Sequence, residues 1–275
     1  MRHLAVLSTL AALSLAACSA GDSPLAPSAG STRIVNGAPT GNAYASVGAL
    51  LFDYNGNGVD GGDQWCTGSL VSPTVFVTAA HCVITSDTPP GSQFYVSFSP
   101  DLFGKGFRAI AATGYKADPQ YGHDQANLHD LAVVFLPASA TRGMTPLKLP
   151  TAGLLDQLAA KGSLSKQMFV NVGYGVSATR TGVPGFTWDG KRNYSKSEFM
   201  GLQPTWLGLL MNTSATGEGG DCYGDSGGPK FLDGDATTIV ATVTTGDYNC
   251  RATTWDWRLD TPEARAFLAP FVKLP

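Results

Sequence analysis

Short stretches of apolar residues, or of alternating apolar and polar residues, recur along the chain from residue 34 onward, and turn-forming residues separate them. These stretches are rich in Val, Ile, Phe and Thr, which is typical of β-strands. They span 69–78, 94–98, 131–136, 168–172 and 238–244. Clusters of Gly, Pro, Asn and Asp predict loops at 53–63, 85–92, 118–127 and 181–193. The pattern predicts a β-barrel or β-sandwich with few helices.

The C-terminal end has the pattern of a helix. Thr261, Pro262 and Glu263 are typical of a helix cap and first turn. The apolar residues that follow at helical spacing are Ala264, Phe267, Leu268 and Phe271. We therefore expect one short amphipathic helix at the end of the chain.

The N-terminus has the pattern of an export signal. Arg2 and His3 precede a mostly apolar stretch at 4–15, which is too short to span a bilayer and typical of a secretory signal peptide. The sequence Leu15-Ala16-Ala17-Cys18 resembles the lipobox of bacterial lipoproteins, in which the cysteine is lipidated. An ordinary signal peptide with an incidental cysteine is the alternative. We assign residues 1–17 to the signal peptide, 18–33 to a flexible tether or propeptide, and 34–275 to one domain.

The composition supports a turn-rich fold and excludes two classes of partner. Gly accounts for 33 of 275 residues, well above the average of about 7%. Lys and Arg total 18 against 21 Asp and Glu, with no basic cluster, so nucleic-acid binding is not expected. No later apolar stretch is long enough to cross a bilayer. We expect a monomer whose only link to a membrane is a lipid on Cys18 of the precursor.

Five cysteines are an odd number for an exported protein. A lipid on Cys18 leaves an even set for an oxidising compartment, namely Cys66, Cys82, Cys222 and Cys250. Four cysteines allow three pairings, and their spacing does not choose among them. The chain has no Cys-x-x-Cys pair and its four histidines are scattered, so neither a metal site nor a cofactor is expected.

The clearest chemical motif is Gly224-Asp225-Ser226-Gly227-Gly228-Pro229. A serine between glycines sits on a tight turn with its hydroxyl exposed and nearby amides free to bind an oxyanion. A purely structural glycine loop is the alternative. The motif also fits the nucleophile elbow of α/β-hydrolases, which requires a histidine after the serine. Every histidine of this chain precedes Ser226, so that class is excluded.

A serine nucleophile needs a base within hydrogen-bond reach. His81 follows the apolar stretch 75–80 and is next to Cys82. Asp130 begins a buried strand, where a carboxylate is costly unless it is hydrogen-bonded, and an imidazole is a natural partner. His123 and His129 are expected to be ordinary surface or loop residues.

Four motifs, in this order, resemble those of the trypsin/chymotrypsin-like serine proteases. They are Ile34-Val35-Asn36-Gly37, Thr78-Ala79-Ala80-His81-Cys82, Asp130-Leu131-Ala132 and Gly224 to Pro229. The four motifs are distributed along the domain at 34–275, so the resemblance applies to the whole domain. The resemblance implies an all-β fold of two six-stranded antiparallel β-barrels, with the active site between them and a C-terminal helix.

The resemblance also implies roles for individual residues. Ser226 would be the nucleophile, His81 the general base and then acid, and Asp130 the group that orients the imidazole. The amides of Gly224 and Ser226 would form the oxyanion hole. Disulfides would join Cys66 to Cys82 and Cys222 to Cys250.

Activation is a further implication. Cleavage after Arg33 would free the ammonium of Ile34, which in this family pairs with the aspartate before the serine, here Asp225. Since a buried carboxylate is unfavourable without a partner, this pairing would shape the nucleophile loop. The same cleavage would separate the domain from the tether at 18–33 and would release the enzyme from its membrane anchor.

The expected specificity pocket departs from the trypsin pattern. Trypsins carry Asp six residues before the serine, where this chain has Gly220. Residues that we expect to line the pocket are Gly220, Asp221, Thr244, Gly246 and Asp256. A carboxylate in a low-dielectric pocket favours Lys or Arg before the scissile bond. A large apolar residue is the alternative, with Asp221 turned into a hydrogen-bond network.

We therefore expect an exported serine endopeptidase, periplasmic or extracellular when mature, that hydrolyses polypeptides through an acyl-enzyme. An inactive protease-like binding protein and an esterase on the same scaffold are the alternatives. One other pattern, the start of an EF-hand loop at 53–60, lacks the required Glu because Gln64 stands at its twelfth position, so a polar hairpin tip is favoured.

Overall fold

The computed structural model describes residues 34–178 and 185–275. The segments predicted to be a signal peptide (1–17) and a tether (18–33), with Cys18 and Arg33, lie outside the described residues. Among the described residues, no helix is long and apolar enough to cross a membrane.

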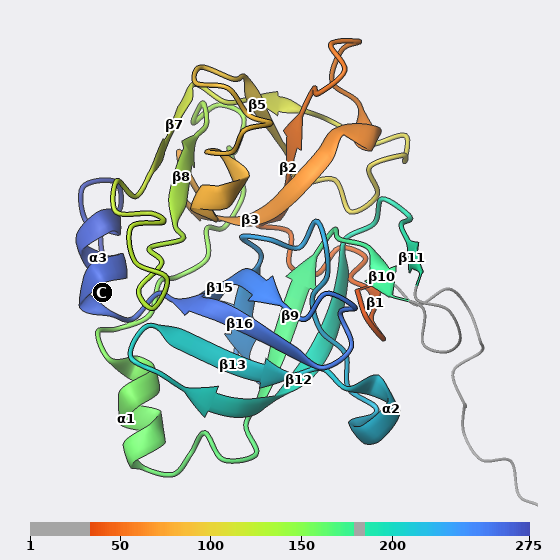
Figure 1. Ribbon diagram of the computed structural model, residues 1–275. Coiled ribbons are helices and arrows are strands. Elements are labelled where there is room, and N and C mark those ends of the chain that lie inside the picture. Colours follow the sequence, from red (N-terminus) through yellow and green to blue (C-terminus); the bar gives the residue numbers. More distant parts are fainter. Residues whose placement is uncertain (1–33, 179–184) are drawn as a thin grey trace, which may run out of the picture. The chain divides into compact units, whose positions relative to one another are not determined.

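The first barrel is built from residues 47–135. Its antiparallel strands are β2 (Val47–Phe52), β3 (Gln64–Ser72), β4 (Val75–Thr78), β5 (Phe94–Ser97), β6 (Ile110–Ala111), β7 (Gly114–Ala117) and β8 (Ala132–Phe135), in the order β6-β5-β2-β3-β4-β8-β7. The two edge strands, β6 and β7, are halves of one bent stretch. Ala112 donates its amide hydrogen to Phe94 on one edge, and Thr113 donates to Phe135 on the other. The sheet therefore curls on itself (Figure 1).

The second barrel is a closed ring of six strands. They are β9 (Met168–Gly173), β12 (Asn193–Leu202), β13 (Trp206–Leu210), β14 (Pro229–Leu232), β15 (Ile239–Gly246) and β16 (Thr253–Arg258). The order is β12-β13-β16-β15-β14-β9, and β9 pairs back with β12 to close the ring. The short β1 (Ala38–Pro39) adds to β12. This all-β architecture, with one closed six-stranded barrel and one curled sheet that forms a half-barrel, confirms the predicted fold class.

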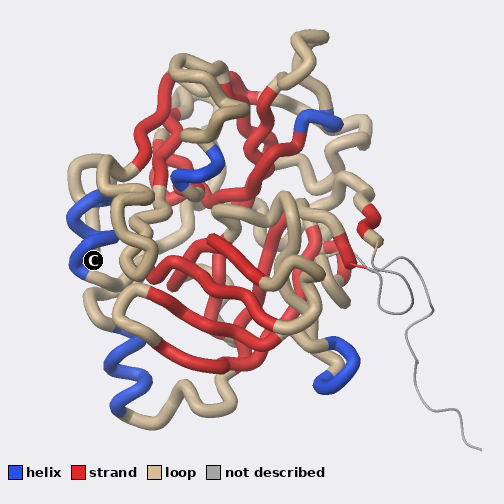
Figure 2. Tube along the Cα trace, viewed as in Figure 1, coloured by secondary structure: helices blue, strands red, loops and turns tan. Residues whose placement is uncertain are grey.

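The remaining elements are short, as Figure 2 shows. They are the 3-10 turns η1 (Gly61–Asp63) and η2 (Ala80–Cys82), the hairpin β10 (Ser177–Ala178) and β11 (Phe186–Thr187), and the helices α1 (Leu154–Ala160), α2 (Thr213–Thr216) and α3 (Pro262–Leu268). Helix α3 is the predicted C-terminal helix, with the hydroxyl of Thr261 accepting a hydrogen bond from the amide of Ala264. Phe271 lies beyond its last turn and packs on Phe267.

The two barrels share a continuous apolar core. Val77 and Val133 of the first barrel pack in the same buried cluster as Val172 and Phe231 of the second. Burial of such side chains is the main contribution to folding stability. This shared core fixes the loops of both barrels that meet at the candidate site.

A buried arginine also ties the barrels together. The Arg192 side chain is 1% exposed, and it donates hydrogen bonds to neutral oxygen atoms. Its acceptors include the carbonyls of Ala43, Val47 and Phe98 and the Tyr174 hydroxyl. Loss of this guanidinium would leave buried acceptors unsatisfied.

Two details of the predicted elements were wrong. The stretch 69–78 is not one strand, because a turn at Pro73 and Thr74 separates β3 from β4. The predicted loop at 181–193 contains β11 and the first residue of β12. Strand β12 has the sequence Asn-Tyr-Ser-Lys-Ser-Glu-Phe-Met-Gly-Leu. Its first buried positions carry polar residues that form hydrogen bonds, so the alternation of apolar and polar residues that marks a strand is not visible in the sequence.

Candidate active site

Strand pairing brings His81 and Asp130 together. His81 lies in η2, just after β4, and Asp130 lies just before β8, which is the neighbour of β4. The Nδ1 atom of His81 is 2.8 Å from Oδ2 of Asp130, and the backbone amide of His81 donates to Oδ1 at 2.9 Å. Asp130 is fully buried, whereas 29% of the His81 side chain is exposed. The imidazole is thus held on one side and reaches the surface on the other.

Ser226 lies on a tight loop that is anchored on the first barrel. Its carbonyl accepts a hydrogen bond from the amide of Thr67 at 2.9 Å. Gly227 has a φ of +77°, and a Cβ there would collide with the hydroxyl oxygen of Thr78. Only glycine fits this position, because the chain needs both a left-handed conformation and the close approach.

The backbone of the loop leaves two amides unused. Gln64 and Thr67 donate from their side chains to the carbonyl of Gly224, at 2.8 and 2.9 Å. Across residues 34–178 and 185–275, the amides of Gly224 and Ser226 donate to no backbone carbonyl. These two donors are therefore available to a group bound beside the Ser226 hydroxyl.

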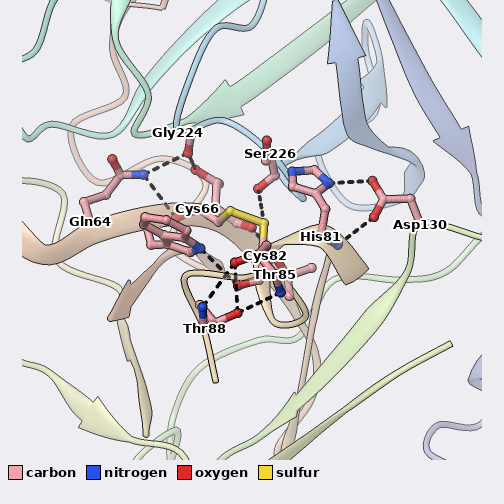
Figure 3. The surroundings of a disulfide bond; sticks show 12 residues. Gln64, Cys66, His81, Cys82, Thr85, Thr88, Asp130, Gly224 and Ser226 are labelled. Atoms are coloured by element: carbon pink, nitrogen blue, oxygen red, sulfur yellow. Dashed lines mark hydrogen bonds and ion pairs between the residues drawn. A yellow bond between two sulfur atoms is a disulfide. The ribbon is translucent and has the colours of Figure 1, made fainter. Parts of the chain in front are cut away.

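Ser226 and His81 face the same cleft, which has a volume of about 410 Å³. In Figure 3 the imidazole lies between Ser226 on one side and Asp130 on the other. Further lining residues include Tyr223, Thr244, Gly246 and Thr254. The cleft is thus lined by an acid-paired imidazole and a serine, and the loop that carries the serine has two amides free of backbone acceptors in the described part of the chain.

Asp225 is fully buried beside Ser226. Its carboxylate accepts hydrogen bonds from the amides of Gly175 at 2.8 Å and Cys222 at 2.9 Å. Burial raises the pKa of Asp225 to about 8, with the neighbouring carboxylate of Asp221 adding to the effect. A Cβ on Gly173 would collide with this carboxylate, so its pocket is closely fitted.

Ile34, the residue expected to become the new N-terminus, is fully buried. Its neighbour Val35 exchanges two backbone hydrogen bonds with Gly220, at 3.0 and 3.1 Å. Gly220 is part of the segment that leads to Asp225 and Ser226. The start of the domain is therefore packed beside the nucleophile loop.

Of Gly220 and Asp221, both expected to line the pocket, Asp221 lines the cleft, whereas Gly220 is not among the lining residues. A Cβ on Gly220 would collide with the side chain of Met211, so the methionine occupies the space next to this glycine. Asp221 is 4% exposed and its Oδ2 contacts the ammonium of Lys230, which is completely buried. Lys230 was missed by the sequence analysis, although a single charge in the strand Pro-Lys-Phe-Leu so close to Ser226 was a usable signal.

Two other expected pocket residues, Asp256 and Thr244, lie near this floor. Oδ1 of Asp256 lies 3.6 Å from the Lys230 ammonium and accepts a hydrogen bond from the Thr254 hydroxyl at 3.1 Å. Burial raises the pKa of Asp256 to about 8. The Thr244 hydroxyl is buried and has no hydrogen-bond partner in the described part of the chain. Gly246 is on the exposed rim.

Both expected disulfides are confirmed. Cys66 is bonded to Cys82, next to His81, and Cys222 is bonded to Cys250, beside the cleft. Disulfides of this kind form in oxidising compartments, which fits an extracellular protein. His81 lies close to Cys66 and Cys82, but both sulfur atoms are engaged in the disulfide.

The EF-hand-like segment forms a hairpin tip between β2 and β3. The carboxylate of Asp53 accepts hydrogen bonds from the amides of Gly56 and Gly58, so its oxygens serve the turn itself. His129 lies in a loop, as expected. Its Nδ1 lies 3.1 Å from the carboxylate of Asp118, and its ring packs 5.6 Å from that of Trp257.

The strand order gives the chain a chymotrypsin-like fold. The trypsin family model matches residues 45–256, and the chain therefore belongs to the trypsin family.

Among curated proteins, the chain is similar to glucanase inhibitor protein 2 of Phytophthora sojae, with 27% identity over 259 residues that cover 89% of this chain and 80% of the relative. Among solved structures, it is similar to HBP, with a TM-score of 0.64, 17% identity, and coverage of 88% of this chain and 98% of the other. A structure of human heparin binding protein gives a TM-score of 0.62, 15% identity, and coverage of 87% of this chain and 96% of the other. At these identities the structures establish the shared fold.

Proposed function

We propose that this chain is an exported serine endopeptidase. The observation that supports this most strongly is the buried Asp130 bonded to His81 within the cleft that also holds Ser226. An activated serine requires this arrangement of nucleophile, base and orienting acid. Peptide bonds of polypeptides are the proposed substrate class, and besides water the proposed chemistry uses only side chains and backbone amides of this chain.

In the proposed mechanism, the Ser226 hydroxyl oxygen attacks the carbonyl carbon of the scissile bond, and its proton passes to Nε2 of His81. The hydrogen bond from Nδ1 to Asp130 keeps Nε2 unprotonated before attack and stabilises the imidazolium afterwards. The imidazolium then donates its proton to the leaving amine as the carbon–nitrogen bond breaks. Water attacks the resulting acyl-enzyme with His81 again acting as base, and Ser226 regains its proton.

The negative charge on the carbonyl oxygen develops in the tetrahedral intermediate. The amides of Gly224 and Ser226 are proposed to bind this oxygen, because in the described part of the chain both are free of backbone acceptors. Loss of one such donor typically costs about 3–4 kcal/mol of transition-state stabilisation.

Activation is proposed to follow cleavage after Arg33. The burial of Ile34 and the bonds between Val35 and Gly220 support a new N-terminus close to the nucleophile loop. Its ammonium would supply Asp225 with the cation that a buried carboxylate needs. With a lipid on Cys18, the same cut would release the enzyme from a bacterial membrane into the periplasm or the medium.

A non-catalytic binding protein is the second candidate, because the relatives found carry the names of a glucanase inhibitor and a heparin binding protein. An esterase on the same scaffold would share the acyl-enzyme chemistry. Labelling of the active-site serine with a fluorophosphonate separates these classes. We expect covalent labelling at Ser226 that His81→Ala abolishes, whereas an unlabelled, folded protein would support the binding protein. Turnover of esters without peptides would identify an esterase.

A further inference from the structure

Lys230 is a charged side chain that the proposed mechanism does not use. It lies in β14, four residues after Ser226, and is completely buried. Its ammonium contacts the carboxylate of Asp221 and donates to the amide oxygen of Asn171 at 2.8 Å. A buried ammonium is unfavourable unless it is paired and hydrogen-bonded, so the position of Lys230 is closely determined.

The partner of Lys230 lines the cleft. Two carboxylates are among the lining residues, those of Asp221 and Asp247. Oδ1 of Asp247 accepts hydrogen bonds from the amides of Ala252 and Thr253, at 2.7 and 3.0 Å, and thus holds its own loop together. Asp221 is therefore the carboxylate that would meet a cationic side chain at the floor of the cleft, and one of its oxygens, Oδ2, already pairs with Lys230.

The rest of the floor carries little charge. Burial holds the pKa of Asp256 at about 8, so this group is mostly protonated at neutral pH, and Lys230 with Asp221 forms a pair without net charge. Met211 fills the space beside Gly220, and its terminal methyl group would lie 3.7 Å from a Cβ on Gly246 at the rim. Val243 and the disulfide of Cys222 add apolar surface.

We propose that Lys230 is a specificity-determining residue: its pairing with Asp221 neutralises the cleft floor, so that the site accepts a large neutral side chain before the scissile bond and excludes Lys and Arg. A cationic side chain would have to approach a buried ammonium of like charge and compete with it for Asp221. As a statement about substrate selection, this proposal rests on the proposed endopeptidase function. It replaces the expectation that Asp221 selects Lys or Arg.

Binding of two probes tests the proposal without catalysis. Benzamidine carries a cationic amidinium and benzamide is its neutral counterpart of similar shape. Their dissociation constants are measured by ligand-observed NMR on the full chain with Ser226→Ala. We expect benzamide to bind, and benzamidine to bind less than about threefold tighter than benzamide, a difference too small for a free carboxylate at the floor. A larger preference for benzamidine, or no binding of benzamide, would overturn the proposal.

Substitution of the lysine gives the second comparison. Lys230→Met frees Asp221, and we expect benzamidine binding to strengthen at least about tenfold relative to benzamide. An unchanged ratio in a folded variant contradicts the proposal. Lys196→Met is the matched control, because Lys196 is an exposed lysine paired with Asp233 outside the cleft. In this variant the ratio of the dissociation constants of benzamide and benzamidine should equal that of the parent. The first comparison needs no change at Lys230 and remains decisive if Lys230→Met does not fold.

Turnover separates this proposal from the proposed activity. If the processed chain cleaves peptides, kcat/KM should be at least about tenfold higher with Phe or Leu than with Arg before the scissile bond. A chain that binds benzamide as expected but cleaves no peptide would contradict the endopeptidase activity and leave the assignment of the floor intact. A chain that cleaves after Arg in preference to Phe or Leu would support the activity and overturn the role of Lys230.

Discussion

Asp130 holds His81 at two points, with one carboxylate oxygen 2.8 Å from Nδ1 of the imidazole and the other 2.9 Å from the backbone nitrogen of the same residue. The carboxylate is completely buried and the imidazole is partly exposed. Because both bonds go to one residue, the ring orientation is fixed relative to its own backbone. A buried carboxylate beside Nδ1 favours the tautomer of His81 that carries its proton on Nδ1.

Asp130→Asn should therefore leave the fold intact and lower kcat for peptide hydrolysis by about 10³–10⁴-fold, because an amide at this position stabilises neither the required tautomer nor the imidazolium. Steady-state kinetics with a peptide substrate measures the loss. Asp118→Asn is the control, since Asp118 pairs with the neighbouring His129 and not with His81. An equal loss in both variants would mean that the effect is structural.

Processing at Arg33 should control activity. Arg33→Gln is expected to leave a folded precursor that trypsin-like proteases do not cut at this bond and that has only a small fraction of wild-type activity. N-terminal sequencing of the active wild-type protein should give Ile34 as the first residue. Full activity in a chain that starts upstream of Ile34 would refute the role of Asp225 as partner of the new ammonium.

The stability of the intact chain should fall as pH rises from about 4 to about 8. Asp225 and Asp256 have pKa values raised from 3.8 to about 8 by burial. The unfolded chain loses these protons first, so the folded state binds more protons throughout this window, and each group contributes a slope of up to about 1.4 kcal/mol per pH unit. The free energy of unfolding in urea, measured at about pH 5 and about pH 8, should fall less in Asp225→Asn than in the parent. An equal or larger fall in the variant would contradict these pKa values.

Arg192 should matter for stability more than any exposed arginine. Arg192→Met removes the donor to several buried carbonyls and to the Tyr174 hydroxyl, and we expect the free energy of unfolding to decrease by at least about 3 kcal/mol. Arg142→Met, at an exposed position, is the control and should change it by less than about 0.5 kcal/mol. Equal effects of the two substitutions would show that the Arg192 bonds contribute no more than surface contacts.

Local signals in the sequence were sufficient for much of the fold and for the residues around Ser226. The glycines at 224 and 227 predict a turn, and in the structure both have a positive φ. Thr261 predicts the start of a helix, and it caps the helix whose apolar residues follow at regular spacing. These features depend on a few neighbouring residues, and neighbours along the chain are visible in a sequence.

The floor of the cleft was not predictable in the same way. Lys230, Asp221 and Asn171 come from three separate segments, and only the closure of the second barrel brings them together. A lysine in a short strand normally faces solvent, so the sequence pattern alone places the Lys230 side chain on the solvent side of the sheet and not in the interior, where the structure has it. No local signal indicates that Met211 fills the space beside Gly220, which is a contact between separate strands and loops.

Hydrolysis of peptide bonds by Ser226, His81 and Asp130 is the activity proposed for this chain. The most direct measurement is turnover of a mixed peptide library by the processed chain starting at Ile34, beside the same chain with Ser226→Ala. We expect the parent to release new peptide termini, and the variant to keep its melting temperature and lose at least about 10³-fold in kcat. Absence of peptide turnover in the folded parent, or equal turnover in Ser226→Ala, would contradict the account.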